Sequence, residues 1–200
     1  MNTDPGASSG LRLERFTAQN ADLVLSWRNA PHVRTNFLSD AEITREGHLA
    51  FLDTLERRNW HFFILSENDV PLAVLNVNKD GTDSLWGCYI GGDIVPRPGL
   101  FPVLIGVAGV LAFDVLGCDT LNSDVLRSNP APQKINTFLG IPEIGTRTDT
   151  RPTGEMIEVL CYRATRKDWP AISARMDKIL TKSMRDMLAE FAADPLSRIT

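Results

Sequence analysis

The sequence predicts an α+β fold in which helices pack on a central sheet. Segments with the alternating or continuous apolar pattern of strands occur both before and after helical segments. Between them lies a stretch, 102–116, that is helical in pattern and apolar on nearly every side. Such a helix must be covered on most of its faces, as a central helix on a sheet is. An amphipathic segment near the end of the chain, 168–192, predicts one further long helix.

The first part of the chain predicts a strand and two helices. Residues 11–16 alternate apolar and polar side chains and are expected to form the first strand. Asn20 is a candidate N-cap of a first helix, which Pro31 ends because the residue before a proline avoids the helical conformation. Thr44 is the expected N-cap of a second helix, in which apolar residues follow at helical spacing.

The middle of the chain predicts three strands joined by polar turns, followed by the apolar helix. Gly106 and Gly109 lower the helix propensity of this segment, so we expect it to pack closely against a strand. The remainder adds a strand, a short helix ended by Gly140, and a hairpin. The expected strands after the first are 60–66, 71–78, 84–90, 120–126, 143–148 and 156–163, and the short helix is 131–139.

The composition is typical of a globular protein that acts on a small molecule. Of its 200 residues, 43% are hydrophobic and 23% are charged. The net charge of −4, without any cluster of basic residues, argues against a nucleic-acid partner. The three histidines form no metal-binding pattern, so no metal is expected.

Cysteine spacing and hydropathy indicate the compartment. The three cysteines lie far apart without CxxC spacing, which favours buried thiols in a reducing compartment. The start of the chain, 1–10, is polar and is expected to be a flexible tail rather than a secretory signal. The apolar stretch 101–116 is too short to cross a bilayer. We therefore expect a cytoplasmic protein without membrane contact.

Three local motifs carry a resemblance to a known family. Trp27-Arg28-Asn29 lies in the first predicted helix, and Glu46-Gly47-His48-Leu49 lies in the second. Asn129 precedes the short helix that ends in Leu139-Gly140-Ile141. With the order of the elements, these motifs resemble the GNAT superfamily of acyl-CoA-dependent acyltransferases. Within it, they are most similar to the aminosugar N-acetyltransferases of the pseudaminic acid pathway.

The resemblance implies a GNAT fold over 11–163, with a mixed central sheet flanked by helices. Residues 164–200 are then a helical extension that packs on the domain or on a second copy in a homodimer. The implied activity is N-acyl transfer of an acetyl or related group from acetyl-CoA, the co-substrate, to a small-molecule amine, a nucleotide-linked amino-deoxysugar. Two alternatives remain open: a protein N-terminal or side-chain acetyltransferase, and a non-catalytic GNAT-fold binding or scaffold module.

The diphosphate of CoA is expected at the start of the apolar helix, where relatives carry Gln/Arg-x-x-Gly-x-Gly/Ala. Free backbone amides at a helix N-terminus bind such a group. Here Gly99 takes the place of the first glycine and Phe101 that of the second, while prolines at 96, 98 and 102 remove amide donors. The resemblance implies Arg97, Gly99, Leu100 and Phe101 at the diphosphate, Asn129 and Lys134 at the pantetheine, and Tyr89 and Ile90 along the channel.

The residues that transfer protons in relatives are missing from this chain. A tyrosine often follows in the short helix, whereas the matching residue here is Asn136, which donates a hydrogen bond but no proton at neutral pH. The run 84–89 also lacks the glutamate that relatives carry on this strand. His48 is chemically suited to be a general base, with a packing role as its alternative. The expected catalytic residues are therefore His48 and Asn136.

The acceptor side is expected around the first helix and one strand. The Trp-Arg-Asn resemblance implies Trp27, Arg28 and Asn29 as substrate-binding residues, with a surface salt bridge as the alternative for Arg28. Asn76 and Asn78 share one face of a predicted strand, where asparagine is depleted. They either hydrogen-bond the acceptor or belong to a solvated face of the sheet.

Overall fold

Seven strands form one mixed sheet in the computed structural model, which describes residues 10–91 and 98–200. Their order is β1-β2-β3-β4-β5-β7-β6, and the neighbours are antiparallel except for the parallel pair β4–β5. The predicted strands all form, with bounds within two residues of those expected. They are β1 (Leu11–Arg15), β2 (Trp60–Glu67), β3 (Val70–Asp80), β4 (Asp83–Ile90), β5 (Thr120–Leu126), β6 (Glu143–Thr150) and β7 (Met156–Thr165).

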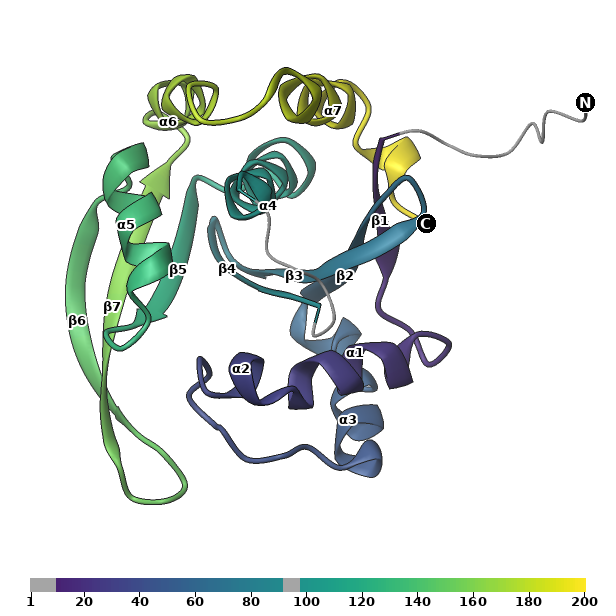
Figure 1. Cartoon of the computed structure of the whole chain (residues 1–200), viewed down its shortest axis with the longest axis vertical. Helices are drawn as coiled ribbons and strands as arrows, with labels where there is room; N and C mark the ends of the chain where they lie inside the picture. Colours follow the sequence, from purple (N-terminus) through teal and green to yellow (C-terminus); the bar gives the residue numbers. More distant parts are fainter. Residues whose placement is uncertain (1–9, 92–97) are drawn as a thin grey trace, which may run out of the picture.

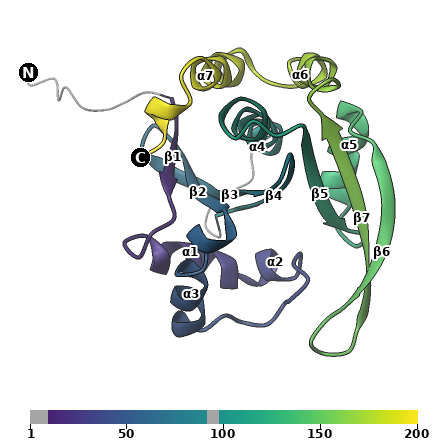
Figure 2. The same cartoon turned by 180° about the vertical axis from the view of Figure 1, so that it is seen from behind.

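Helices cover both faces of the sheet, which confirms the predicted α+β class (Figure 1). On one face lie α1 (Ala21–Asn29), α2 (Pro31–Arg34) and α3 (Arg45–Leu52). On the other lie α4 (Leu100–Gly109), continued by a π-helical turn (Val110–Val115), and above it α6 (Trp169–Met176) and α7 (Lys182–Ala193). Helix α5 (Pro130–Leu139) lies against β5 and β7, as the view from behind also shows (Figure 2).

The helix N-caps are placed as expected, but one of them bonds differently. The Thr44 hydroxyl accepts a hydrogen bond from the backbone N–H of Gly47 (3.1 Å), which confirms it as the cap of α3. Asn20 precedes α1 but makes no capping bond. Its side chain accepts from the N–H of Thr17 (2.9 Å) and donates to Glu14 and the Arg15 carbonyl. An asparagine side chain can satisfy the turn before a helix instead of the helix itself, and here it does so.

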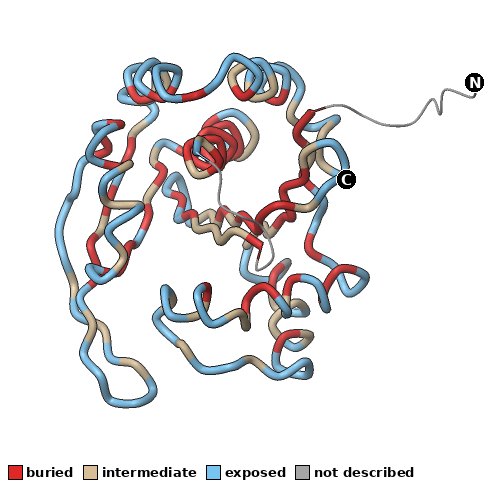
Figure 3. Tube along the Cα trace, in the orientation of Figure 1, coloured by how far each residue is buried: buried red, intermediate tan, exposed pale blue. Residues whose placement is uncertain are grey.

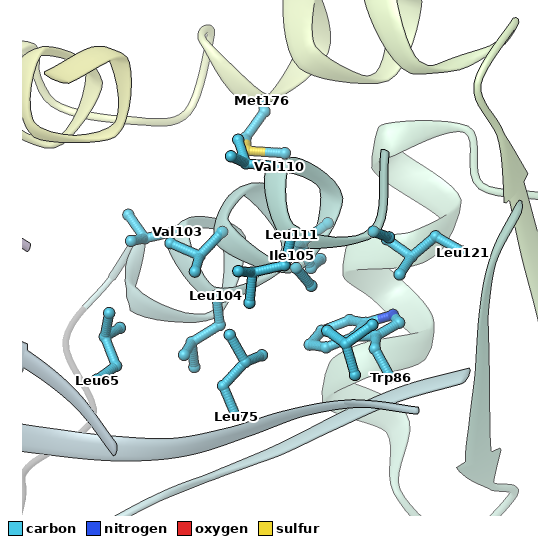
Figure 4. Packing of buried hydrophobic residues seen from close by; sticks show 14 of the residues in the cluster. Leu65, Leu75, Trp86, Val103, Leu104, Ile105, Val110, Leu111, Leu121 and Met176 are labelled. Atoms are coloured by element: carbon cyan, nitrogen blue, oxygen red, sulfur yellow. The ribbon is translucent and has the colours of Figure 1, made fainter. Parts of the chain in front are cut away.

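Helix α4 is the centre of the core, as its apolar pattern predicts. It is the most continuously buried helix in Figure 3 and packs between the sheet and the C-terminal helices. In Figure 4, Val103, Leu104 and Ile105 of α4 lie near Leu65 and Leu75 of the sheet, with Met176 of α6 on the other side.

The glycines of α4 do not face a strand, contrary to expectation. A Cβ at Gly106 would lie 2.5 Å from a methyl carbon of Leu188, and one at Gly109 would lie 1.9 Å from Trp169 Cζ2. Both contacts come from the C-terminal helices. The glycines therefore let α6 and α7 approach α4, which sequence spacing alone could not reveal because both partners lie far along the chain.

The C-terminal segment forms two helices instead of the single long helix predicted. Helix α6 ends at Met176, and α7 begins after Thr181, whose hydroxyl accepts from the backbone N–H of Met184 (3.3 Å). The break lets both helices turn apolar residues toward α4, because Met176 and Met184 are both buried in the cluster around it. The last residue, Thr200, pairs through its backbone with Leu13 (2.9 Å) and Arg15 (2.8 Å) of β1.

Candidate functional site

The parallel pair β4–β5 is joined at one end only. Leu85 pairs with Asn122 and Trp86 with Ser123, and these are the pairs that the two strands form in the described residues. Beyond them the strands diverge and leave a gap in the sheet (Figure 1). Both strands therefore have backbone groups along this gap that no neighbouring strand satisfies.

The direction of the hydrogen bonds shows which backbone groups face the gap. The N–H of Gly91 donates to the carbonyl of Leu72 on β3 (2.8 Å). Because alternate residues of an antiparallel strand direct their backbone groups to opposite sides, those of Cys88 and Ile90 point away from β3 and into the gap. On the other wall, the N–H of Arg127 donates to the Glu158 carbonyl on β7 (2.9 Å), so the groups of Asp124 point toward β4 by the same rule.

A cleft of about 760 Å³ occupies the gap. Both strands contribute to its walls, together with α2 and the loop after it, the first turn of α4, and α5. Helices α2 and α4 lie on opposite faces of the sheet, so the cleft passes through the sheet from one face to the other. Its volume falls within the range of small-molecule sites. This cleft is the candidate functional site.

The α4 end of the cleft offers free amides. Gly99 precedes α4 with a φ of 91°, a left-handed conformation that favours glycine. The N–H groups of Leu100 and Phe101 lie in the first helical turn, where no carbonyl of the helix can accept from them. Pro102 is the third residue of α4, still in that turn, so its missing N–H costs little. The Phe101 ring lies 6.0 Å from that of Trp86, and both line the cleft.

Helix α5 brings one unsatisfied polar atom to the cleft. Asn136 lines the cleft but is only 2% exposed, and its Oδ1 has no hydrogen-bond partner. A buried carbonyl oxygen without a partner costs about 1–3 kcal/mol, so a donor from a ligand would relieve it. Asn129, at the start of α5, also lines the cleft, whereas Lys134 is exposed and does not.

At the α2 end, aromatic rings form one wall. Phe37 and Tyr89 line the cleft, with ring centroids 5.6 Å apart in an edge-to-face arrangement. The guanidinium of Arg28 stacks behind Phe37, 3.8 Å from its centroid, and its Nη2 donates to the Ser39 carbonyl (2.9 Å). Burial lowers the pKa of Arg28, and its Nη1 has no partner. Arg28 thus supports the wall from behind but does not itself line the cleft.

The loop that carries Phe37 is also tied to the β6–β7 hairpin. Arg151 from the hairpin forms ion pairs with Asp40 (3.1 Å) and Glu155 (2.9 Å). It also donates to the carbonyls of Thr35 (3.2 Å) and Phe37 (3.5 Å). The Arg151 side chain is only 12% exposed, so these bonds are shielded from solvent. The hairpin therefore fastens the loop across the α2 end of the cleft.

The structure brings together some of the residues that the sequence predicts for the site. Tyr89, Ile90, Gly99, Phe101, Asn129 and Asn136 all line the cleft. Leu100 lies in the core, although its backbone N–H is at the start of α4. Trp27 is buried against Gly91, where a Cβ would lie 2.7 Å from the indole. Arg97 lies outside the described residues.

Four predicted residues do not line the cleft, and two of them, His48 and Asn29, make structural contacts. His48 is buried beside Phe16, with ring centroids 5.0 Å apart, so we assign it the packing role. Asn29 exchanges hydrogen bonds with the backbone of Ile43 (2.8 and 2.9 Å) and fixes the loop before α3. Asn76 lies over Gly87 of β4, 3.0 Å from where a Cβ would be, and Asn78 keeps a buried, unpartnered Oδ1. A helical or strand pattern shows which residues share a face but not what covers that face.

Sequence reasoning missed several residues of the cleft. Trp86 and Ser123 lie where β4 and β5 separate, and His32 and Phe37 belong to α2 and the loop after it. The Trp86–Ser123 pairing joins segments that are not adjacent in sequence, so no local signal identifies it. The short helix α2 begins at Pro31, which was predicted only as the end of the first helix. A proline also favours the first turn of a new helix, and that signal could have located His32.

The titratable groups of the cleft are mostly neutral or paired. Burial raises the pKa of the Cys88 thiol to about 12 and also raises the pKa of Tyr89, so both stay protonated at neutral pH. Asp124 forms an ion pair with Arg147 (2.8 Å). In the described residues no group of His, Cys, Asp and Glu is placed to hold a metal ion. Within the same residues no helix is long and apolar enough to cross a membrane.

Comparison with known proteins identifies the fold. Neither a protein-family profile nor any curated protein sequence matches the chain. The spermidine N-acetyltransferase of Vibrio cholerae, solved with CoA and spermine, matches with a TM-score of 0.72 and 12% identity over 82% of this chain and 99% of its own. An N-acetyltransferase from Staphylococcus aureus Mu50 matches with a TM-score of 0.64 and 16% identity over 78% and 99% of the respective chains.

An aminoglycoside acetyltransferase in complex with coenzyme A and kanamycin matches with a TM-score of 0.65 and 16% identity, over 80% of this chain and 97% of its own. At such identities the likeness establishes the fold. The chain has the mixed-sheet fold of the GNAT acetyltransferases, as the sequence predicts, with its C-terminal helices added on α4.

Proposed function

We propose that this protein is an N-acetyltransferase that transfers an acetyl group from acetyl-CoA to the amine of a small molecule. The observation that carries the proposal is the gap between β4 and β5, whose unpaired backbone edges lead to the N-terminus of α4. A flexible arm with amides can pair with such edges as a strand would, while an anion at its end binds the free amides of the helix. The similarly folded acetyltransferases solved with CoA support the same co-substrate.

The residues present fit this co-substrate at three points. Backbone groups of Cys88 and Ile90 would pair with the pantetheine amides and hold the thioester carbonyl. The Oδ1 of Asn136, unsatisfied in the cleft wall, would accept from an amide N–H. The amides of Leu100 and Phe101 would bind the diphosphate, aided by the positive end of the α4 dipole.

Acetyl-CoA supplies a thioester whose carbonyl carbon bonds to the acceptor nitrogen as the carbon–sulfur bond breaks, and the amine proton leaves with the thiol product. The cleft residues have to deliver a neutral amine. Burial in an apolar cleft disfavours the ammonium form and so lowers the pKa of a bound amine. His32, at the α2 end, is the imidazole of the described lining and would take the proton that the ammonium loses before the transfer, whereas the second proton leaves with the thiol. His32 replaces His48 as the candidate base because His48 lies outside the cleft.

The acceptor enters from the α2 face, opposite the α4 terminus. The predicted acceptor, a nucleotide-linked amino-deoxysugar, would need cations for its diphosphate on that face. Arg28 is held behind Phe37, and Arg34 pairs with Glu42 (3.7 Å). Neither lines the cleft. The structure therefore supports a small-molecule amine in general, and the resemblance to the pseudaminic acid branch is the support for the sugar nucleotide.

Isothermal titration with acetyl-CoA and CoA tests the proposal directly. We expect saturable binding of both, and at ligand about 100-fold above Kd a rise in Tm of about 5–10 °C. Acetylation of amines is then followed by release of free thiol. No binding at millimolar CoA would rule out the enzyme. Binding without turnover of any amine would favour the alternative of a GNAT-fold binding or scaffold module.

A further inference from the structure

The acceptor end of the cleft is chemically distinct from the α4 end. Alternation along β4 turns Leu85 and Tyr89 toward the α1–α2 face, because Tyr89 pairs with Val74, which packs with α1. Val33, Phe37 and Leu38 of α2 and the following loop also line this end. These side chains are apolar except for the Tyr89 hydroxyl, and the exposed side chains of His32 and Asn36 add two polar groups at the same end.

Few charges reach this cleft. Its described lining contains no lysine or arginine, and its one carboxylate, Asp124, is engaged by Arg147 (2.8 Å). Among the described lining residues, a second ammonium of an acceptor would find no unpaired carboxylate, and an acceptor anion would find no lysine or arginine. Burying an unpaired charge in apolar surroundings is strongly unfavourable. The lining therefore selects against both polycations and anions.

Two exposed apolar side chains mark the same end. Leu38 is 42% exposed and Leu85 is 40% exposed, although both lie at the cleft. Exposed apolar residues gathered at the mouth of a cleft indicate an apolar occupant. The wall behind them is fixed by the Arg28 stack on Phe37 and by the bonds of Arg151 to the loop. The cleft is thus preformed for a ligand of fixed shape.

We infer that the acceptor is a monoamine with an apolar body, best an arylalkylamine whose ring packs against Phe37, Leu38 and Leu85. This inference rests on the proposed function and names its substrate class. A monoamine differs from spermine and kanamycin, which each carry several amines and are bound in the similarly folded enzymes. The single ammonium enters the apolar end and loses its proton there, so no second charge remains buried.

Steady-state acetylation by the full chain with four acceptors tests this inference. Phenethylamine has the apolar ring and one amine, and phenylalanine adds only a carboxylate to it. Spermine and kanamycin are the polycations. We expect kcat/KM for phenethylamine to exceed that for each of the other three about tenfold or more, since apolar pockets discriminate by such factors. A preference for spermine or kanamycin, or equal use of phenylalanine, overturns the inference.

A substitution at the cleft mouth adds a readout that misfolding cannot imitate. Leu38→Asp places a carboxylate at an exposed loop position, where it can pair with a second ammonium. We expect the ratio of kcat/KM for phenethylamine to that for spermine to fall about tenfold, with the affinity for acetyl-CoA unchanged. Leu196→Asp, at a 68% exposed apolar residue outside the cleft, is the matched control and should leave the ratio as it is.

The outcomes separate this inference from the proposed function. If CoA does not bind, the proposed function fails and the inference fails with it. If CoA binds and spermine is the better acceptor, or if no arylalkylamine is acetylated, only the substrate class is wrong. An unchanged ratio in Leu38→Asp also counts against an acceptor that packs at this wall.

Discussion

The packing of α6 on α4 can be tested at a single glycine. Gly109 has helical backbone angles, with a φ of −62°, so alanine fits the backbone and should gain about 1 kcal/mol of helix propensity. The new Cβ, however, would lie 1.9 Å from Cζ2 and 2.3 Å from Cη2 of Trp169. Carbon atoms pack at about 3.5–4.0 Å, so the ring must move by roughly 1.5–2 Å.

The expected cost follows from the position of Trp169. Its ring lies 5.2 Å from that of Phe113 and is partly buried, so it has little room to move. Overpacking of this kind costs about 1–3 kcal/mol. After the gain in propensity, Gly109→Ala should lower the free energy of unfolding by up to about 2 kcal/mol, and Tm by up to about 8 °C.

Thermal and urea unfolding measure this change. Gly47→Ala in α3 is the matched control, because the side chain there would meet only Thr44 Oγ1 at 3.3 Å and Ile43 at 4.0 Å. We expect the control to lie between no change and a gain of about 1 kcal/mol. In the double variant Gly109→Ala/Trp169→Leu the two losses should be less than additive. A rise in Tm for Gly109→Ala alone would refute the close contact between α4 and α6.

Three further predictions concern the site and its surroundings. Arg151→Met should raise KM for the amine several-fold and speed proteolysis of the 35–43 loop without changing CoA affinity, because the loop loses its bonds to the hairpin. The control is Arg45→Met, which removes an exposed ion pair with Asp22. Equal effects of the two substitutions would contradict the role of Arg151. Asn136→Leu removes a buried oxygen that has no hydrogen-bond partner, so Tm should stay the same or rise, while the CoA affinity measured by titration should fall about tenfold. A lower Tm with unchanged CoA affinity would mean that Asn136 serves the fold alone. Burial lowers the pKa of His48 below 6.5, so the unfolded chain binds a proton at higher pH than the folded chain, and stability present above pH 6.5 is lost as the pH falls toward the folded pKa. Urea unfolding at about pH 7.5 and about pH 5.5 should therefore show a smaller loss for His48→Gln than for the wild type, and an equal loss would show that His48 does not contribute.

The secondary structure followed from local patterns because its causes are local. Alternation located β1, and Thr44, followed by apolar residues at helical spacing, located the start of α3. The apolar surface of α4 correctly predicted that it is buried on nearly all sides. The long C-terminal helix was wrong, because a continuous apolar stripe does not show where Thr181 starts a new helix against α4.

The site residues that could be predicted are those whose position a motif gave and whose chemistry suits the cleft. Gly99 and Asn136 were identified from spacing, and both line the cleft. His48 was assigned to the site for its chemistry and Asn29 for the Trp-Arg-Asn resemblance, but the His48 ring packs against Phe16 and the Asn29 side chain bonds to the Ile43 backbone. Phe37 and Arg151 carry no local signal, since their roles depend on contacts between segments that are distant in the sequence.

The sequence by itself determined the order of strands and helices, the burial of α4 and the glycine at its N-terminus, because propensity, periodicity and capping act within a few residues. Only the tertiary structure decided which strands, helices and loops contact one another. The pairing of β4 with β5 at one end only leaves the gap, the glycines of α4 let α6 and α7 pack closely, and Arg151 fixes the loop that carries Phe37. These features depend on pairings across the chain, whose energies come from packing and charge burial that no short segment contains.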